Sequence, residues 1–127
     1  MYRLPPLPQL KLSKRAIWPG CDEIEVEGEL DLAVADRLRL LLDRSAHDSR
    51  HVLVDLKGCD FVDVAVLEVL VEADERLAAR GCQLLLFGAR GQPRRLLEVT
   101  DLAGGGHPFG ARHELAKSVS KELFAAA

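Results

Sequence analysis

The chain has 127 residues, the usual size of one domain, so we expect a single hydrophobic core. Its 48% hydrophobic and 29% charged residues are ordinary for a globular protein and exclude a disordered or fibrous class. A net charge of -3 offers no overall attraction to nucleic acid, which is not expected as a partner. No apolar run approaches the roughly 20 residues of a membrane helix, so direct membrane insertion is not expected either.

The N-terminus and the cysteines predict a cytoplasmic location. Prolines interrupt the first residues, where a secretory signal would need an apolar helix. The three cysteines, Cys21, Cys59 and Cys82, are odd in number and lack the C-x-x-C spacing of zinc or redox sites. No two histidines stand at i, i+4 on a predicted helix. We therefore expect reduced thiols, no metal site and no cofactor.

The first half of the chain predicts strands separated by a helix. Residues 9–17 are candidates for an edge strand, and apolar and acidic residues alternate over residues 24–30 as in a half-exposed strand. Asp31 is placed to cap a helix, in which apolar residues recur at helical spacing up to the polar residues 45–50. Residues 51–56 are β-branched and nearly all apolar, which is typical of a central strand buried on both sides.

The second half continues this alternation. We expect a turn at residues 57–58, and then a second helix that is capped by Asp63 and ended by Gly81. A buried strand at residues 83–87 and a third helix starting near Pro93 follow. The order of strand and helix predicts an α/β fold with a largely parallel sheet and right-handed crossovers.

Three segments stand out by their order and spacing over residues 24–102: residues 27–31, residues 52–56 with 61–63, and residues 93–102. Together they resemble the STAS domain, the fold of bacterial anti-sigma factor antagonists. The resemblance implies an α/β, STAS-type fold, with a central mixed, mostly parallel sheet of four to five strands and flanking helices. We expect one such domain over residues 1–127.

The resemblance also implies a function in protein binding rather than catalysis. It indicates an anti-sigma factor antagonist-like module that binds a kinase-type anti-sigma factor and so releases a sigma factor, which is a role in transcription regulation. The alternative is an accessory STAS subunit of a membrane transport complex of the ABC type, docking on its ATPase. A homodimer is compatible with either interpretation. No nucleophile beside a base can be assembled from the sequence, so we do not expect an enzyme.

One motif of the family is incomplete in this chain. In phosphorylatable members of the family that this chain resembles, the motif is Asp-Ser-Ser/Thr-Gly. Its first hydroxyl residue accepts phosphate from the partner kinase. The matching residues here are Asp63, Val64, Ala65 and Val66. Valine stands at the acceptor position, and a phosphoester cannot form without an oxygen nucleophile. We therefore predict that the protein has no phospho-acceptor at this position and that the surrounding surface, residues 63–66, still binds a partner.

Two further apolar residues are candidates for that surface. Leu67 and Val71 flank the core-facing stripe of the second helix, so they either widen the core or form an exposed docking strip. We include both in the predicted partner-binding set. Asp63 is either a partner contact or simply the cap of the helix.

The remaining candidates have ordinary structural alternatives. Asp55 is either a ligand-binding carboxylate or a hydrogen-bonded one at an edge or strand end. Arg90, Arg94 and Arg95 either bind an anionic group or form a solvated helix start. Cys59 is either an oxidisable regulatory thiol or a buried, inert one. A glycine run at residues 104–106 is expected to be a connection to a terminal helix at residues 112–124.

Overall fold

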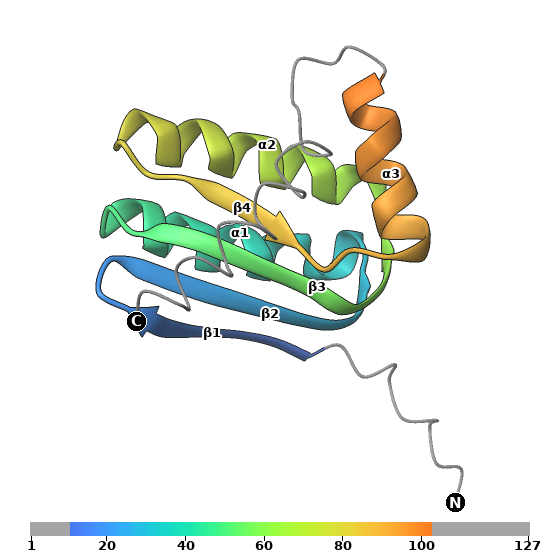
Figure 1. The fold of residues 1–127 in the computed structure, drawn as a ribbon, viewed down its shortest axis with the longest axis horizontal. Helices are drawn as coiled ribbons and strands as arrows, with labels where there is room; N and C mark the ends of the chain where they lie inside the picture. Colours follow the sequence, from blue (N-terminus) through green and yellow to red (C-terminus); the bar gives the residue numbers. More distant parts are fainter. Residues whose placement is uncertain (1–10, 103–127) are drawn as a thin grey trace, which may run out of the picture.

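The computed structural model describes residues 11–102, in which four strands and three helices follow one another (Figure 1). The elements are β1 (Lys11–Trp18), β2 (Cys21–Leu30), α1 (Leu32–His47), β3 (His51–Val62), α2 (Val64–Ala79), β4 (Leu84–Phe87) and α3 (Gly91–Leu102). The predicted terminal helix at residues 112–124 and the glycine run lie outside the described residues.

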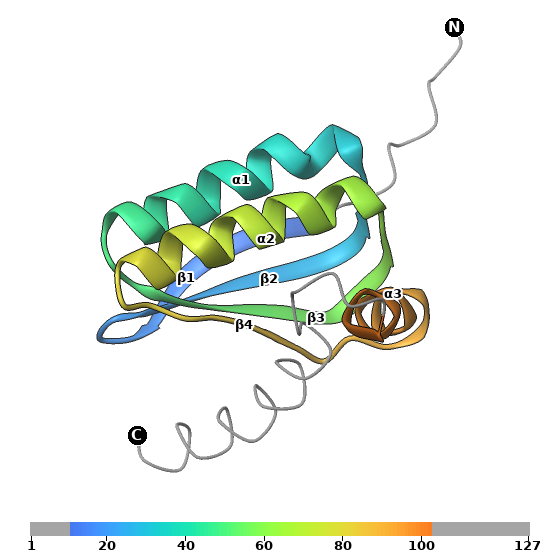
Figure 2. The same cartoon turned by 90° about the horizontal axis from the view of Figure 1, so that it is seen from above.

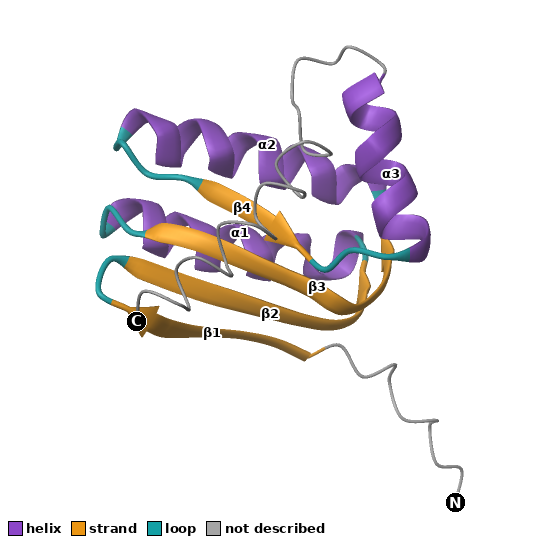
Figure 3. Cartoon of the chain, in the orientation of Figure 1, coloured by secondary structure: helices purple, strands orange, loops and turns teal. Residues whose placement is uncertain are grey.

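The strands form one mixed sheet in the order β1-β2-β3-β4 (Figure 3). β1 pairs with β2 in antiparallel fashion, whereas β2 with β3 and β3 with β4 are parallel. The α/β class and the mostly parallel sheet are therefore confirmed, with four strands in the described part of the chain. The predicted edge strand at residues 9–17 corresponds to β1.

Two helices cover one face of the sheet. Figure 2 shows α1 and α2 side by side over the strands, while α3 lies at the end of the sheet beside β3 and β4. The core between helices and sheet includes Ile24, Val26, Leu38, Val54 and Leu70, all at most 1% exposed. The periodicity of the sequence thus identified the middle of the buried face of each helix, including Leu38 and Leu70.

The central strand is longer than predicted. β3 continues through the expected turn at residues 57–58, and the pairing with β2 shifts between Glu25 and Glu27 and again after Gly28. A Cβ on Gly58 would come within 2.9 Å of Cγ of Glu27. The glycine is thus required by the close approach of β2 at an irregularity of the ladder, not by a reversal of the chain.

A buried polar cluster joins β2 to the end of α1. Asp22 is 4% exposed and accepts hydrogen bonds from Oγ of Ser45 and Nε of Arg50, both at 2.7 Å. Nζ of Lys14 lies 3.8 Å from the same carboxylate. Burial raises the pKa of Asp22, but the hydrogen bonds from Ser45 and Arg50 and the two positive charges outweigh it, so the pKa lies below its ordinary value.

Candidate docking site

The ends of β2 and β3 lie next to each other where the two covering helices begin. Leu30 pairs with Val62, and the N–H of Asp63 donates to the carbonyl of Leu30 at 2.8 Å. α1 then starts at Leu32 and α2 at Val64, at the same side of the sheet (Figures 1 and 2). We call this side the carboxyl edge, because the parallel strands end there. Crevices at such ends are common binding sites in α/β folds.

The two helix starts at the carboxyl edge are capped differently. Asp63 is extended at φ -72° and ψ 144°, and its Oδ1 accepts the N–H of Ala65 at 2.9 Å, which confirms the predicted cap. Asp31 stands at the N-cap position of α1, but its side chain makes no capping hydrogen bond. Its Oδ1 is buried without a hydrogen-bond partner among the described residues. The predicted position of Asp31 is correct, whereas the expected capping bond is absent.

The residues after Asp63 carry no hydroxyl group and differ in exposure. Val64, which the resemblance places at the phospho-acceptor position, is 63% exposed. Ala65 is half-buried, and Val66 is completely buried in the core. Of the predicted set over residues 63–66, only the first three can therefore be reached by a partner in this conformation.

The prediction of an exposed docking strip on α2 is wrong for Leu67. Its side chain is 7% exposed and belongs to the core cluster. Val71 is half-buried and packs against the same cluster. α2 contacts both α1 and the sheet, so its buried face is wider than a single apolar stripe. Of the two alternatives for Leu67, widening of the core is the correct one.

Three exposed apolar residues stand instead at the carboxyl edge. Leu32 is 68% exposed and Val64 63%, and Phe61, the last residue but one of β3, is 39% exposed. Leu40 and Val99 are the other exposed large apolar residues of the described chain. We call Leu32, Phe61 and Val64 the docking patch. Sequence reasoning missed Leu32, because it stands at the first position of a helix, outside the periodic stripe.

A glutamine that the sequence did not single out fixes α3 to this edge. Oε1 of Gln92 accepts the N–H of Val62 at 2.9 Å, and its Nε2 donates to the carbonyl of Val62 at 3.0 Å. This pair of bonds satisfies the last backbone groups of β3 immediately before Asp63. Of the nearby arginines, Arg94 forms an ion pair with Glu98 at 2.9 Å, which favours the interpretation of a solvated helix.

The other candidates have structural partners. Asp55 is 8% exposed, accepts the N–H of Lys57 at 2.9 Å and lies on an inner strand opposite Phe87, the last residue of β4. Cys59 is 1% exposed, and burial raises the pKa of its thiol, so it is a poor nucleophile. Within residues 11–102 no group of histidine, cysteine or acidic side chains is arranged to hold a metal ion.

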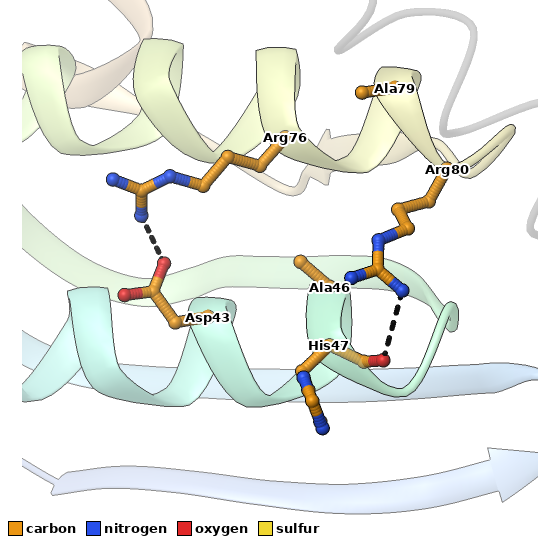
Figure 4. A pocket seen from close by; sticks show the side chains of 6 residues that line it. All are labelled: Asp43, Ala46, His47, Arg76, Ala79 and Arg80. Atoms are coloured by element: carbon orange, nitrogen blue, oxygen red, sulfur yellow. Dashed lines mark hydrogen bonds and ion pairs between the residues drawn. The ribbon is translucent and has the colours of Figure 1, made fainter.

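A surface pocket of about 380 Å³ lies between the last turns of α1 and α2 (Figure 4). Arg76 is bound to Asp43 across it, and Arg80 donates to the carbonyl of His47 at 3.3 Å. The arginines thus cross-link the helices and neutralise the negative ends of two helix dipoles. This use of their charge explains the pocket without a ligand.

Comparison with protein-family models gives a match to the family described as "Mlab, STAS domain", over residues 14–110. The chain belongs to the STAS domain family. A comparison with curated proteins found no significant match.

Solved structures of STAS proteins have the same fold. The unphosphorylated anti-sigma factor antagonist SpoIIAA is 14% identical, with a TM-score of 0.67 over 81% of this chain and 85% of the other. An anti-sigma factor antagonist from Mycobacterium paratuberculosis is 24% identical, with a TM-score of 0.65 over 78% and 84%. A sulfate transporter family protein from Wolinella succinogenes is 23% identical, with a TM-score of 0.62 over 89% and 93%. The STAS fold therefore occurs in anti-sigma factor antagonists and in a sulfate transporter family protein.

Proposed function

We propose that this STAS protein is a non-catalytic module, similar to anti-sigma factor antagonists, that binds a kinase-type anti-sigma factor through the docking patch without being phosphorylated there. The observation that carries the proposal is Val64, an apolar side chain 63% exposed at the start of α2. Val64 and Leu32 are both exposed apolar residues at the start of a helix, and such residues favour a surface that is covered in a complex. The proposal places the complex in the cytoplasm.

The chemistry of Val64 determines the kind of regulation that we propose. A phosphate at this position would add nearly two negative charges to the docking patch, where free N–H groups and the positive end of α2 would stabilise it. Valine offers no oxygen to receive the phosphate, so the partner's kinase activity leaves this surface unchanged. In the proposed function the chain is permanently competent to bind, and release depends on the partner or on its amount.

The test uses calorimetric titration with the kinase-type anti-sigma factors of the organism that encodes this protein. We expect wild-type protein to bind with the same affinity before and after incubation with ATP, and intact-protein mass spectrometry to find no added phosphate. Val64→Asp should weaken binding by about 2 kcal/mol or more, as expected at the centre of an interface. Val99→Asp is the matched control, because Val99 is similarly exposed, at 59%, on α3. Stoichiometric phosphate coupled to release of the partner would refute the proposal.

The second candidate is an accessory STAS subunit of a membrane transport complex, docking on its ATPase. The similarity to the sulfate transporter family protein supports a role in transport, since that alignment covers 89% of this chain. In the described part of the chain, no helix is long and apolar enough to span a membrane. Binding of an ATPase subunit from a neighbouring transport operon, with no binding of any anti-sigma factor, would favour this candidate over the first.

A further inference from the structure

We infer that the surface that covers the docking patch is basic around an apolar centre. This inference rests on the proposed docking function and specifies the partner's chemistry. Leu32 and Val64 begin α1 and α2 after the paired ends of two neighbouring strands, Leu30 and Val62. Their side chains, at 68% and 63% exposed, form the apolar centre.

Acidic residues stand close to this centre in the sequence and in the strand register. Glu29 is the cross-strand neighbour of Phe61, and Asp60 directly precedes Phe61 on β3. Glu68 stands four residues after Val64, one helical turn further along the same side of α2. All three carboxylate residues are exposed. We call Glu29, Asp60 and Glu68 the acidic rim.

The acidic rim is not neutralised within the described structure. Glu72, further along α2, is paired with Arg39 at 3.6 Å, and Asp36 on α1 is paired with Arg39 at 2.8 Å. None of the three rim residues forms an ion pair with a residue between positions 11 and 102. The arginines nearest in sequence to Gln92 belong to α3 or directly precede it.

The acidic rim around the apolar centre indicates a partner with positively charged side chains around its own apolar centre. Polar rims around an apolar centre steer association and exclude wrong partners, while the centre supplies most of the affinity. Lysine or arginine side chains facing the acidic rim would find carboxylates that have no competing cation among the described residues. An acidic partner would bring like charges together and be rejected.

The test uses ¹⁵N-labelled full-length protein and two synthetic amphipathic helical peptides of equal length. Both carry leucine on one face, and the opposite face carries arginine in one peptide and glutamate in the other. We expect the arginine peptide to shift amide signals at residues 29–32 and 60–68 saturably, and the glutamate peptide to leave them unchanged. Equal effects of both peptides, or shifts confined to other surfaces, would overturn the inference.

Charge variants sharpen the test. Glu29→Gln and Glu68→Gln should each weaken binding of the arginine peptide about 2- to 5-fold, as is usual for exposed ion pairs, and less so at high salt. Asp48→Asn is the matched control, because it removes an exposed carboxylate at the opposite end of α1. An unchanged affinity in both rim variants would also count against the inference.

The proposed function is decided separately, by the anti-sigma factor titration. If that partner requires Val64 but binds the Glu29→Gln and Glu68→Gln variants as well as wild type, the function stands and the basic partner surface is wrong. If the arginine peptide binds as expected while no anti-sigma factor does, the surface chemistry stands and the assignment of the partner fails.

Discussion

The clearest consequence of the structure is that truncation of two apolar residues of α2, three positions apart, should change the unfolding free energy by very different amounts. Leu67 is 7% exposed and part of the core, whereas Val64 is 63% exposed at the helix start. A buried Leu→Ala change removes transfer free energy and leaves a cavity, and it costs between about 2 and 5 kcal/mol. Because Leu67 lies at the margin of the core, we expect Leu67→Ala to cost about 2–3 kcal/mol of unfolding free energy.

Val64→Ala should change the same free energy by no more than about 0.5 kcal/mol, because it removes little buried surface. Guanidinium chloride unfolding followed by circular dichroism measures both variants on one scale, and equal slopes allow the midpoints to be compared directly. In the titration with the partner the order should reverse, with Val64→Ala the more damaging change. A stability loss for Val64→Ala as large as that for Leu67→Ala would show that the burial argument is wrong.

Three further predictions concern groups that position the carboxyl edge and its opposite end. Asp63→Ala should lower the unfolding free energy by about 1 kcal/mol through loss of its cap, whereas Asp31→Ala, which loses no capping bond, should cost less in the same unfolding assay. Gln92→Ala should cost about 1–3 kcal/mol, because it leaves both backbone groups of Val62 without their partners, and hydrogen exchange of the Val62 amide should accelerate. Because the pKa of Asp22 is lowered by folding, its contribution to the unfolding free energy is present above the unfolded pKa, about 3.9, and is lost as pH falls through the folded pKa. Asp22→Asn should therefore make the unfolding free energy less dependent on pH in the acidic range. An unchanged dependence on pH would contradict this.

Local patterns were sufficient to predict most of the fold. The spacing of apolar residues in α1 and α2 reports their contact with the sheet directly, and the apolar run in β3 reports burial on both sides. The cap at Asp63 was also predictable, since it depends only on residues two positions apart. These features arise from interactions that are close in sequence or repeated along one element.

The errors arise where distant segments meet. Gly58 indicated a turn, but it serves the close approach of Glu27 on another strand. Leu67 lies outside a one-sided helical stripe, but α2 is covered by both α1 and the sheet. Gln92 binds Val62 across a separation of thirty residues, and no local pattern indicates that contact. The sequence was therefore least informative about contacts between distant segments, including the contact of Gln92 with Val62 at the carboxyl edge.

Restoring hydroxyl groups at the start of α2 would test whether only the acceptor is missing. Val64→Ser with Ala65→Ser recreates two hydroxyls directly after Asp63, on a side chain that is 63% exposed and on its half-buried neighbour. Neither change removes much buried apolar surface, so the double variant should stay within about 1 kcal/mol of wild-type stability. A kinase that binds the wild type should then transfer phosphate to the variant, detected by intact-protein mass spectrometry.

The new phosphate should weaken the complex, because it places nearly two negative charges at the apolar centre formed with Leu32, where contact with the partner would remove them from water. The single variant Ala65→Ser is the control, since it adds a hydroxyl but leaves Val64 at the acceptor position. Phosphate transfer to the double variant alone, followed by release of the partner, would mean that the edge still has the geometry of a switch and lacks only an oxygen atom. Absence of transfer by every kinase that demonstrably binds the wild type would mean that the way the partner docks has changed as well, and that Val64 belongs to a different mode of recognition.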